Sequence, residues 1–343
     1  MTAWSIFCKT YRKNRHMTRH SLLALPFLLA LPLVMIAPAA SAQMTFPERV
    51  VTLVVPFPPG SPLDSFARLV AQRLQGKWTK GVIVENKPGA SATIGTNAVA
   101  KAAPDGYTLL FTIDLPITMA PAVLKSVPYR PVEDFAPLGI VGETSNVLFV
   151  GPSVKATTIK ELVSIAKTKP GSLSFASAGI GSPAHFAGAL FGQAAGIEMV
   201  HVPYKGSALA MTDILNGSVS LMIGPVGQAL PQIRKGAVTA LAVTGPARSA
   251  LLPEVSTLAE LGYRELQFTT WYGVFAPART PAQTLATIRS ELKAAVETAE
   301  VKDKAHGVGI EVRWSGPEEL ARAVRADSAT WAKVAAKARI SAD

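Results

Sequence analysis

Short apolar runs alternate with amphipathic stretches in the first third of the chain. Residues 50–57 (VVTLVVPF) are almost continuously apolar, as in a strand covered on both faces. Apolar side chains then recur at helical spacing along one face, at Phe66, Leu69, Val70 and Leu74. The expected elements are strands at 50–57, 82–84 and 107–113 and helices around 66–74 and 93–103. This β-α-β-α-β order predicts a parallel sheet with helices on both faces, because such crossovers are right-handed.

A second series of strands and helices begins near residue 147. Its first helix is expected to start at a capping box, in which Thr158 and Glu161 satisfy free backbone amides. The expected strands are 147–150, 173–176, 198–202, 219–223 and 238–243, with helices at 183–195 and 207–216.

The C-terminal part contains one strand-like run, at 270–275, and is otherwise helical. Ser315 and Glu318 are expected to cap a last helix, whose inward side chains are Leu320, Val324, Trp331 and Val334. A helical tail without its own sheet must pack on something, so we expect it to return to the first sheet. The prediction is two α/β domains, 43–142 with 272–343 and 143–271, hinged at 138–146 and 266–275.

The N-terminal 42 residues are typical of a cleaved secretory signal. Five basic residues precede an apolar run at 22–37, and Ala40-Ser41-Ala42 supplies a small-residue cleavage pattern. A membrane anchor is the alternative, but the run contains prolines and is shorter than the ~20 residues that a spanning helix needs. Translation could also begin at Met17. We interpret the mature chain as exported to the periplasm.

Removal of this segment changes the charge and the cysteine content. It takes away five basic residues and no acidic one, which lowers the formal net charge from +11 to +6, and it removes Cys8, the sole cysteine. The remaining Lys and Arg are scattered, which argues against nucleic acid as a partner. Disulfide-stapled and zinc-cysteine modules are excluded by the same count.

Two strand-to-helix turns are candidate binding loops. Residues 56–65 follow the first strand, and 177–185 follow the strand at 173–176. Ligands bind beyond the carboxyl ends of parallel strands, and a helix N-terminus attracts a carboxylate. Ser61 with Asp64 also forms a capping box, so these two side chains could simply complete the helix. In the second turn, Gly179 and Gly181 match only a relaxed dinucleotide fingerprint, which we do not favour in an exported chain.

An exported serine hydrolase is the alternative function. Ser177 or Ser182 would act with His185, and Asp213 would orient the imidazole. No Gly-x-Ser-x-Gly elbow is present, so we interpret His185 as a hydrogen-bonding residue at a helix start. His201 is expected to be a packed, hydrogen-bonded core residue and His306 a surface residue, and no metal site is expected. Trp271 and Tyr272 are interpreted as packing residues at a domain crossover rather than as a ligand wall.

Six motifs in order resemble one family of exported receptors. They are 56–68 (PFPPGSPLDSFAR), 84–90 (VENKPGA), 104–110 (PDGYTLL), 177–185 (SAGIGSPAH), 201–206 (HVPYKG) and 271–277 (WYGVFAP). Over residues 46–340 the chain is similar to the substrate-binding proteins of tripartite tricarboxylate transporters, the Bug family. The resemblance implies a type II periplasmic-binding-protein fold, with two α/β domains, a hinge and a ligand cleft between them.

The resemblance also implies a role and a set of ligand-binding residues. The role is to capture a small organic carboxylate, with no cofactor and no catalysis, for the membrane subunits of such a transporter; a sensor-only role is the alternative. We expect a monomer. The implied ligand-binding residues are Phe57, Gly60, Ser61, Asp64, Ser65, Ser177, Ala178, Gly179, Gly181, Ser182, His185, Tyr204 and Gly224. The chain departs from the family pattern at three positions. Ser61 replaces a second glycine, Ile180 occupies a position that is commonly polar, and Gly224 occupies a position that is often Asp. The apolar Ile180 and the missing carboxylate lead us to expect a ligand that is a less polar, bulkier or aromatic acid.

Overall fold

The computed structural model describes residues 46–342. The predicted signal at 1–42 and the alternative start at Met17 lie outside these residues. Within the described range, no helix has the length and apolar character that crossing a membrane requires.

The first part of the fold is the predicted parallel β-α-β-α-β unit. Strand β1 (Val51–Val55) pairs in parallel with β2 (Val82–Asn86) and with β3 (Thr108–Ile113). Helix α1 (Pro62–Gln75) and helix α2 (Thr93–Ala100) make the two crossovers. Two separate apolar cores, one with Phe66 of α1 and one with Val99 of α2, show that the helices cover opposite faces of the sheet.

Two long antiparallel strands extend this sheet and differ from the prediction. Strand β4 (Phe135–Val150) has 16 residues and pairs antiparallel with β9 (Thr269–Pro277), which in turn pairs antiparallel with β3. Only the end of β4, at 147–150, was expected to be a strand. The predicted hinge 138–146 lies wholly within β4, and 266–275 overlaps β9. Between β3 and β4 lie η1 (Leu115–Met119), α3 (Ala120–Val123) and a loop.

The continuation of β4 also belongs to the second group of strands. There β4 pairs antiparallel with β7 (Leu221–Pro225) and β8 (Thr239–Val243). Strand β5 (Leu173–Ser177) pairs in parallel with β6 (Met199–Pro203) and with β7. The strand order is β2-β1-β3-β9-β4-β7-β5-β6, with β8 on β4, so β4 links the two groups.

Helices cover both faces of the second group as well. Helices α4 (Ile159–Thr168) and α5 (Pro183–Ala195) contribute to one apolar core, and α6 (Ser207–Leu215) and α7 (Val226–Arg234) contribute to the other. The predicted cap of α4 is present, because the Thr158 hydroxyl accepts from the Glu161 amide at 3.2 Å.

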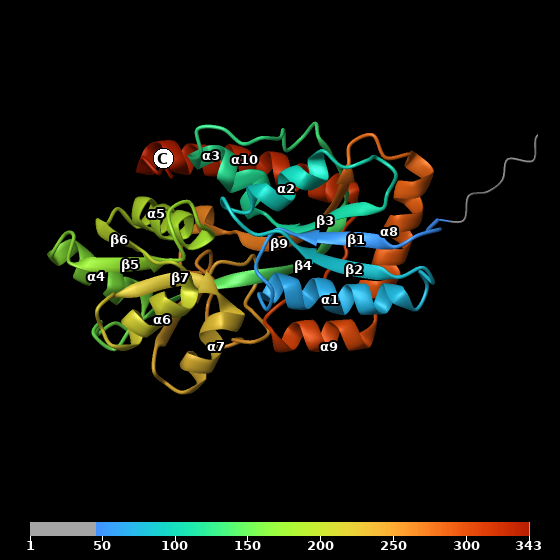
Figure 1. Ribbon diagram of the computed structural model, residues 1–343. Helices are drawn as coiled ribbons and strands as arrows, with labels where there is room; N and C mark the ends of the chain where they lie inside the picture. Colours follow the sequence, from blue (N-terminus) through green and yellow to red (C-terminus); the bar gives the residue numbers. More distant parts are fainter. Residues whose placement is uncertain (1–45, 343) are drawn as a thin grey trace, which may run out of the picture. The chain divides into compact units, whose positions relative to one another are not determined.

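The C-terminal helices return to the first sheet, as the sequence predicts. After η2 (Arg264–Leu266) and β9 come α8 (Ala282–Val296), α9 (Ala299–Gly307) and α10 (Pro317–Ala338). In Figure 1, α8 and α9 lie near α1, whereas α10 lies near α2. The inward positions of α10, Leu320, Val324, Trp331 and Val334, are all buried.

The predicted cap of α10 is wrong. The residue before its first turn is Gly316, and no side chain caps the helix. Ser315 is held by its backbone, whose amide donates to the Ile140 carbonyl while its carbonyl accepts from the Ile140 amide. Ser315, the first residue of the predicted capping box, instead forms an isolated antiparallel β-bridge with Ile140 of β4.

Candidate functional site

Four helices begin at one cavity of about 370 Å³. They are α1, α5, α6 and α7, and each starts directly after a strand or a short loop that follows one. The lining residues at these starts are Ser61, Pro62 and Leu63 of α1, Ser182, Pro183 and Ala184 of α5, Gly206 and Ser207 of α6, and Pro225 and Gln228 of α7. Residues from β3, β4, β7 and β9 complete the wall, among them Thr144, Thr270 and Tyr272.

The four helix starts differ in how their backbone amides are satisfied. At α1, the Ser61 hydroxyl accepts from the Asp64 amide at 3.2 Å. At α5, α6 and α7 no side chain caps the first turn. The first N–H groups of a helix have no partner within it, and they carry about half a positive charge. At α5, Pro183 has no N–H and the His185 amide donates to the Ser182 carbonyl at 3.0 Å, which leaves the Ala184 amide as the donor of this turn. The starts of α6 and α7 and this amide of α5 therefore present donors to whatever occupies the cavity.

Ser182 adds a free hydroxyl to this set of donors. Its Oγ is buried, lines the cavity and has no hydrogen-bond partner within the described residues. The sequence predicted that Ser182 would cap α5; it does occupy the capping position, but its side chain makes no capping bond. A buried hydroxyl without a partner costs free energy, so a ligand oxygen here would be stabilised.

The cavity wall carries no formal charge. Among the described residues that line it, none is Asp, Glu, Lys, Arg or His; the polar ones are serines, threonines, Gln228 and Tyr272. Backbone dipoles and hydroxyl groups therefore set the electrostatics of this cavity.

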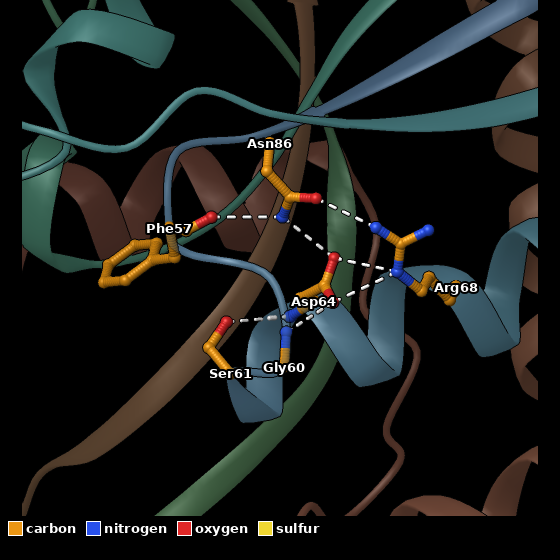
Figure 2. Close-up of polar contacts among 6 residues, drawn as sticks. All are labelled: Phe57, Gly60, Ser61, Asp64, Arg68 and Asn86. Atoms are coloured by element: carbon orange, nitrogen blue, oxygen red, sulfur yellow. Dashed lines mark hydrogen bonds and ion pairs between the residues drawn. The ribbon is translucent and has the colours of Figure 1, made fainter.

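Asp64 holds the first turn together rather than facing the cavity. Its carboxylate accepts from the Gly60 amide at 2.8 Å, from the Asn86 amide group at 2.8 Å and from Arg68 at 3.0 Å. Asn86, at the end of β2, also donates to the Phe57 carbonyl at 3.1 Å. Figure 2 shows these contacts converging on the carboxylate. The network fixes the turn, and with it the direction in which α1 begins.

The protonation of Asp64 reflects these contacts. Burial by itself raises the pKa of the Asp64 carboxyl, but the hydrogen bonds from Arg68, Gly60 and Asn86 together outweigh it and lower the pKa below 3.8. The carboxylate is therefore ionised at neutral pH.

Two stacked histidines hydrogen-bond to the turn at residues 177–185. The rings of His185 on α5 and His201 on β6 lie 3.6 Å apart between centroids, with an interplanar angle of 9°. His185 Nδ1 accepts from the Gly181 amide at 3.2 Å, which agrees with the prediction of a hydrogen-bonding residue at a helix start. His201 Nε2 lies 2.7 Å from the Ser177 hydroxyl. His201 is half-buried and hydrogen-bonded rather than a full core residue, and His306 is exposed as predicted.

Both imidazoles are neutral at physiological pH. Burial lowers the pKa of His185 from 6.5 to about 4. Burial and then the neighbouring His185 lower the pKa of His201 to about 4. Two cations at this ring separation would repel each other, so the stack disfavours protonation of both rings at once.

The geometry does not assemble the serine hydrolase considered above. Ser177 contacts His201 rather than His185, and its hydroxyl donates to the Gly179 carbonyl at 2.9 Å. Asp213, the suggested orienting acid, accepts instead from the Tyr204 hydroxyl at 2.7 Å. The nucleophile, base and acid named from the sequence therefore do not form a triad.

The thirteen predicted site residues separate into three groups. Those that line the cavity are Phe57, Ser61, Ala178 and Ser182. Gly224 lines an adjoining cavity. The remaining eight belong to the turns or the residues behind them: Gly60, Asp64, Ser65, Ser177, Gly179, Gly181, His185 and Tyr204.

The sequence analysis missed the contributions of α6 and α7. Gly206 precedes α6 with φ +133°, and Pro225 precedes α7. Neither start has a capping side chain, so neither has a clear local signature; only the position of each after a strand could have indicated it.

Trp271 and Tyr272 are packing residues, as predicted, but Tyr272 has a second role. Trp271 is buried, and its Nε1 donates to Asp327 at 2.8 Å. Tyr272 packs edge-on against Phe66 and also lines the cavity. In the described part of the chain, no group of three or more His, Cys, Asp or Glu residues is arranged to hold a metal ion.

Comparison with known proteins gives the chain relatives over nearly its whole length. BugT of Bordetella pertussis is 35% identical over 300 residues, which cover 87% of this chain and 92% of BugT. The solved structure of the periplasmic binding protein BugD is 34% identical with a TM-score of 0.74, covering 86% of this chain and 99% of that one. A Rhodopseudomonas palustris structure with adipate is 32% identical with a TM-score of 0.77, and the match covers 86% of this chain and 99% of that one.

These structures share the mixed α/β fold described above. The family model of the tripartite tricarboxylate transporter receptors matches residues 66–339, which begin within α1 and include the starts of α5, α6 and α7. The chain therefore belongs to the family of tripartite tricarboxylate transporter receptors.

Proposed function

We propose that this protein is a periplasmic receptor that captures a small organic carboxylate in the 370 Å³ cavity and delivers it to transporter membrane subunits. One observation carries the proposal: four helix N-termini meet at a cavity whose described lining has no charged side chain. Such a wall attracts an anion through backbone amides and hydroxyl groups, without a charged side chain. The adipate bound to the R. palustris relative is a carboxylate of this kind.

The carboxylate is placed at the starts of α1 and α5. The first turn of α5 supplies the Ala184 amide, and the Ser182 hydroxyl supplies a second donor. Bonds from neutral donors to an anion are stronger than neutral ones, and bridging waters can take part. Micromolar affinity corresponds to about −8 kcal/mol, which a few such bonds in a closed cavity can supply.

Binding is coupled to closure of two domains, 43–142 with 272–343 and 143–271. The α1 start belongs to the first domain and the α5 start to the second, so both meet one anion only in the closed form. Strands β4 and β9 connect the domains and serve as the hinge. Small-angle X-ray scattering should show a smaller radius of gyration with ligand than without it.

The protein acts as a monomer in the periplasm and leaves its ligand unchanged. Export rests on the signal pattern at 1–42, and the relative BugD is a periplasmic binding protein. The absence of catalysis rests on the geometry of Ser177 and Asp213, which are engaged away from His185. Light scattering tests the monomer, and mass spectrometry of a ligand after prolonged incubation tests the absence of turnover.

The central experiment compares acids with their neutral amides. Protein isolated from the periplasm of an expressing bacterium is freed of ligand and titrated calorimetrically with mono-, di- and tricarboxylates and with the matching carboxamides. At least one acid should bind, and its amide should bind at least about tenfold more weakly, because the amide lacks the charge that the helix starts attract. Equal binding of acid and amide would contradict the proposal.

A matched pair of variants places the anion. Ser182→Asp puts a negative charge at the start of α5 and should weaken acid binding by about a hundredfold or more. Thr158→Asp makes a similar change at the start of α4, away from the cavity, and should leave the affinity unchanged. If the two variants bind the acid with equal affinity, the start of α5 does not contact the carboxylate.

A further inference from the structure

A second cavity, of about 470 Å³, adjoins the first one. It lies between α6 and α7 over the end of β7, and it shares four lining residues with the first cavity: Ser207, Met222, Pro225 and Gln228. The two spaces are therefore neighbours, separated by the side chains of these residues.

The second cavity is apolar at its inner wall and uncharged throughout its described lining. Phe149, Met211, Leu215 and Ala229 line it, and its polar residues are Ser207, Thr212, Gln228 and Gln232. No acidic or basic side chain is among the described residues that line it. It therefore has no charged side chain to pair with a second carboxylate, and burial of an unpaired charge is costly.

Met222 lines both cavities, and its side chain lies beside Gly224, which lines the second one. A Cβ on Gly224 would lie 3.1 Å from Met222 Cε, so the methionine side chain lies over the space that a larger residue would fill. Met222 is buried, with 3% of its surface exposed. Methionine is unbranched and adapts to irregular spaces, so Met222 is the shared lining side chain best suited to yield to a ligand.

We propose that the ligand is a monocarboxylate with an extended apolar tail, which passes Met222 and occupies the cavity between α6 and α7. This inference rests on the proposed function, because the carboxylate is placed at the starts of α1 and α5. The second cavity adjoins this position and extends between α6 and α7. A ligand tail that enters it would contact Met211, Leu215 and Phe149. Tail length, rather than a second charged group, then sets the specificity.

The experiment is a chain-length series measured by calorimetry. Straight-chain monocarboxylates of increasing length are titrated into the full ligand-free protein, together with the dicarboxylate of each length. Affinity for the monocarboxylates should rise about fourfold with each added methylene until both cavities are filled. Each dicarboxylate should bind at least tenfold more weakly than the monocarboxylate of equal length.

Two tryptophan variants separate the cavities. Ala208→Trp fills the second cavity from an exposed position on α6 that does not line the first cavity. It should abolish the gain for long acids and leave the affinity for short acids unchanged. Ala332→Trp, at an exposed position on α10, is the matched control and should behave like the unmodified protein.

The possible outcomes distinguish this inference from the proposed function. If short acids bind but affinity does not rise with chain length, or Ala208→Trp changes nothing, the second cavity is not part of the site and the receptor proposal stands. Equal or tighter binding of the dicarboxylates likewise overturns the inference. If no acid of any length binds, both proposals are wrong.

Discussion

Replacing His201 with glutamine should make the protein less sensitive to acid. The stacked rings of His185 and His201 are neutral, and burial holds the pKa of each at about 4. In the unfolded chain each imidazole has a pKa near 6.5, so the unfolded state takes up protons first as the pH falls. The free energy of unfolding therefore falls between pH 6.5 and pH 4, and it rises again as the pH is raised.

The size of this effect follows from the two pKa values. A group that is protonated in the unfolded state but not in the folded state changes stability by about 1.4 kcal/mol per pH unit. Over the interval from 6.5 to 4, each histidine accounts for about 3 kcal/mol. Near pH 5 the pair should give a slope of about 2.7 kcal/mol per pH unit, and His201→Gln should reduce it to about 1.4 or less. Glutamine can keep the hydrogen bond to Ser177.

Urea unfolding at half-unit steps from pH 4.5 to pH 7.5 measures the slope. Glu198 and Lys337 lie near the stack and are present in both proteins, so the difference between the two slopes is assigned to His201. His306→Gln removes an exposed histidine and should leave the slope unchanged. Equal slopes for the unmodified protein and His201→Gln would refute the assignment of acid sensitivity to the stack.

Two further substitutions test buried carboxyl groups. Asp64→Asn removes the charge that the first turn surrounds and should lower the free energy of unfolding at pH 7 by about 2–4 kcal/mol. Because its pKa is lowered, this contribution is present above pH 3.8 and is lost as the pH falls below it. Arg68 is half-exposed and makes only part of the network, so a smaller loss for Asp64→Asn than for Arg68→Ala would contradict the network. Asp114 is buried, and burial and then Asp327 raise its pKa, so its ionisation opposes folding as the pH rises above 3.8. Asp114→Asn should therefore stabilise the protein at pH 8 by about 1 kcal/mol in thermal unfolding, and a comparable loss would show that the carboxylate is needed.

Elements with a local signature could be predicted from the sequence. The apolar run of β1, the one-sided helix pattern around Phe66 and the Thr158 cap each depend on neighbouring residues only, and all are present. Pro62 and Pro183 mark the first turns of α1 and α5, because proline suits a position whose amide has no partner in the helix. These same signals located two of the four helix starts at the cavity.

Strand β4 could not be predicted in full because its early part has no strand pattern. Pro137, Gly139 and Gly142 interrupt it, and the pairing with β9 shifts its register at these places. Polar residues at 143–146 follow, so only the apolar end at 147–150 resembled a strand. Pairing with β9, more than a hundred residues later, supplies what the local sequence lacks.

Tertiary contacts also decide the parts of the site that the sequence did not reveal. His185 and His201 lie on different elements, and nothing in the chain between them indicates that their rings stack. The Ser315-x-x-Glu318 pattern shows the opposite case, in which a good local signal is overridden by backbone pairing with Ile140.

The uncharged wall of the 370 Å³ cavity has a consequence for ligand release. Main-chain amides and hydroxyl groups neither gain nor lose protons at ordinary pH, so near neutral pH a small change in acidity leaves these donors, and their hold on an ionised acid, unchanged. Added salt screens such buried dipoles only weakly. Under the proposed function, unloading would then depend on separation of the helix starts, and contact with the membrane subunits, rather than a change in the medium, would free the acid.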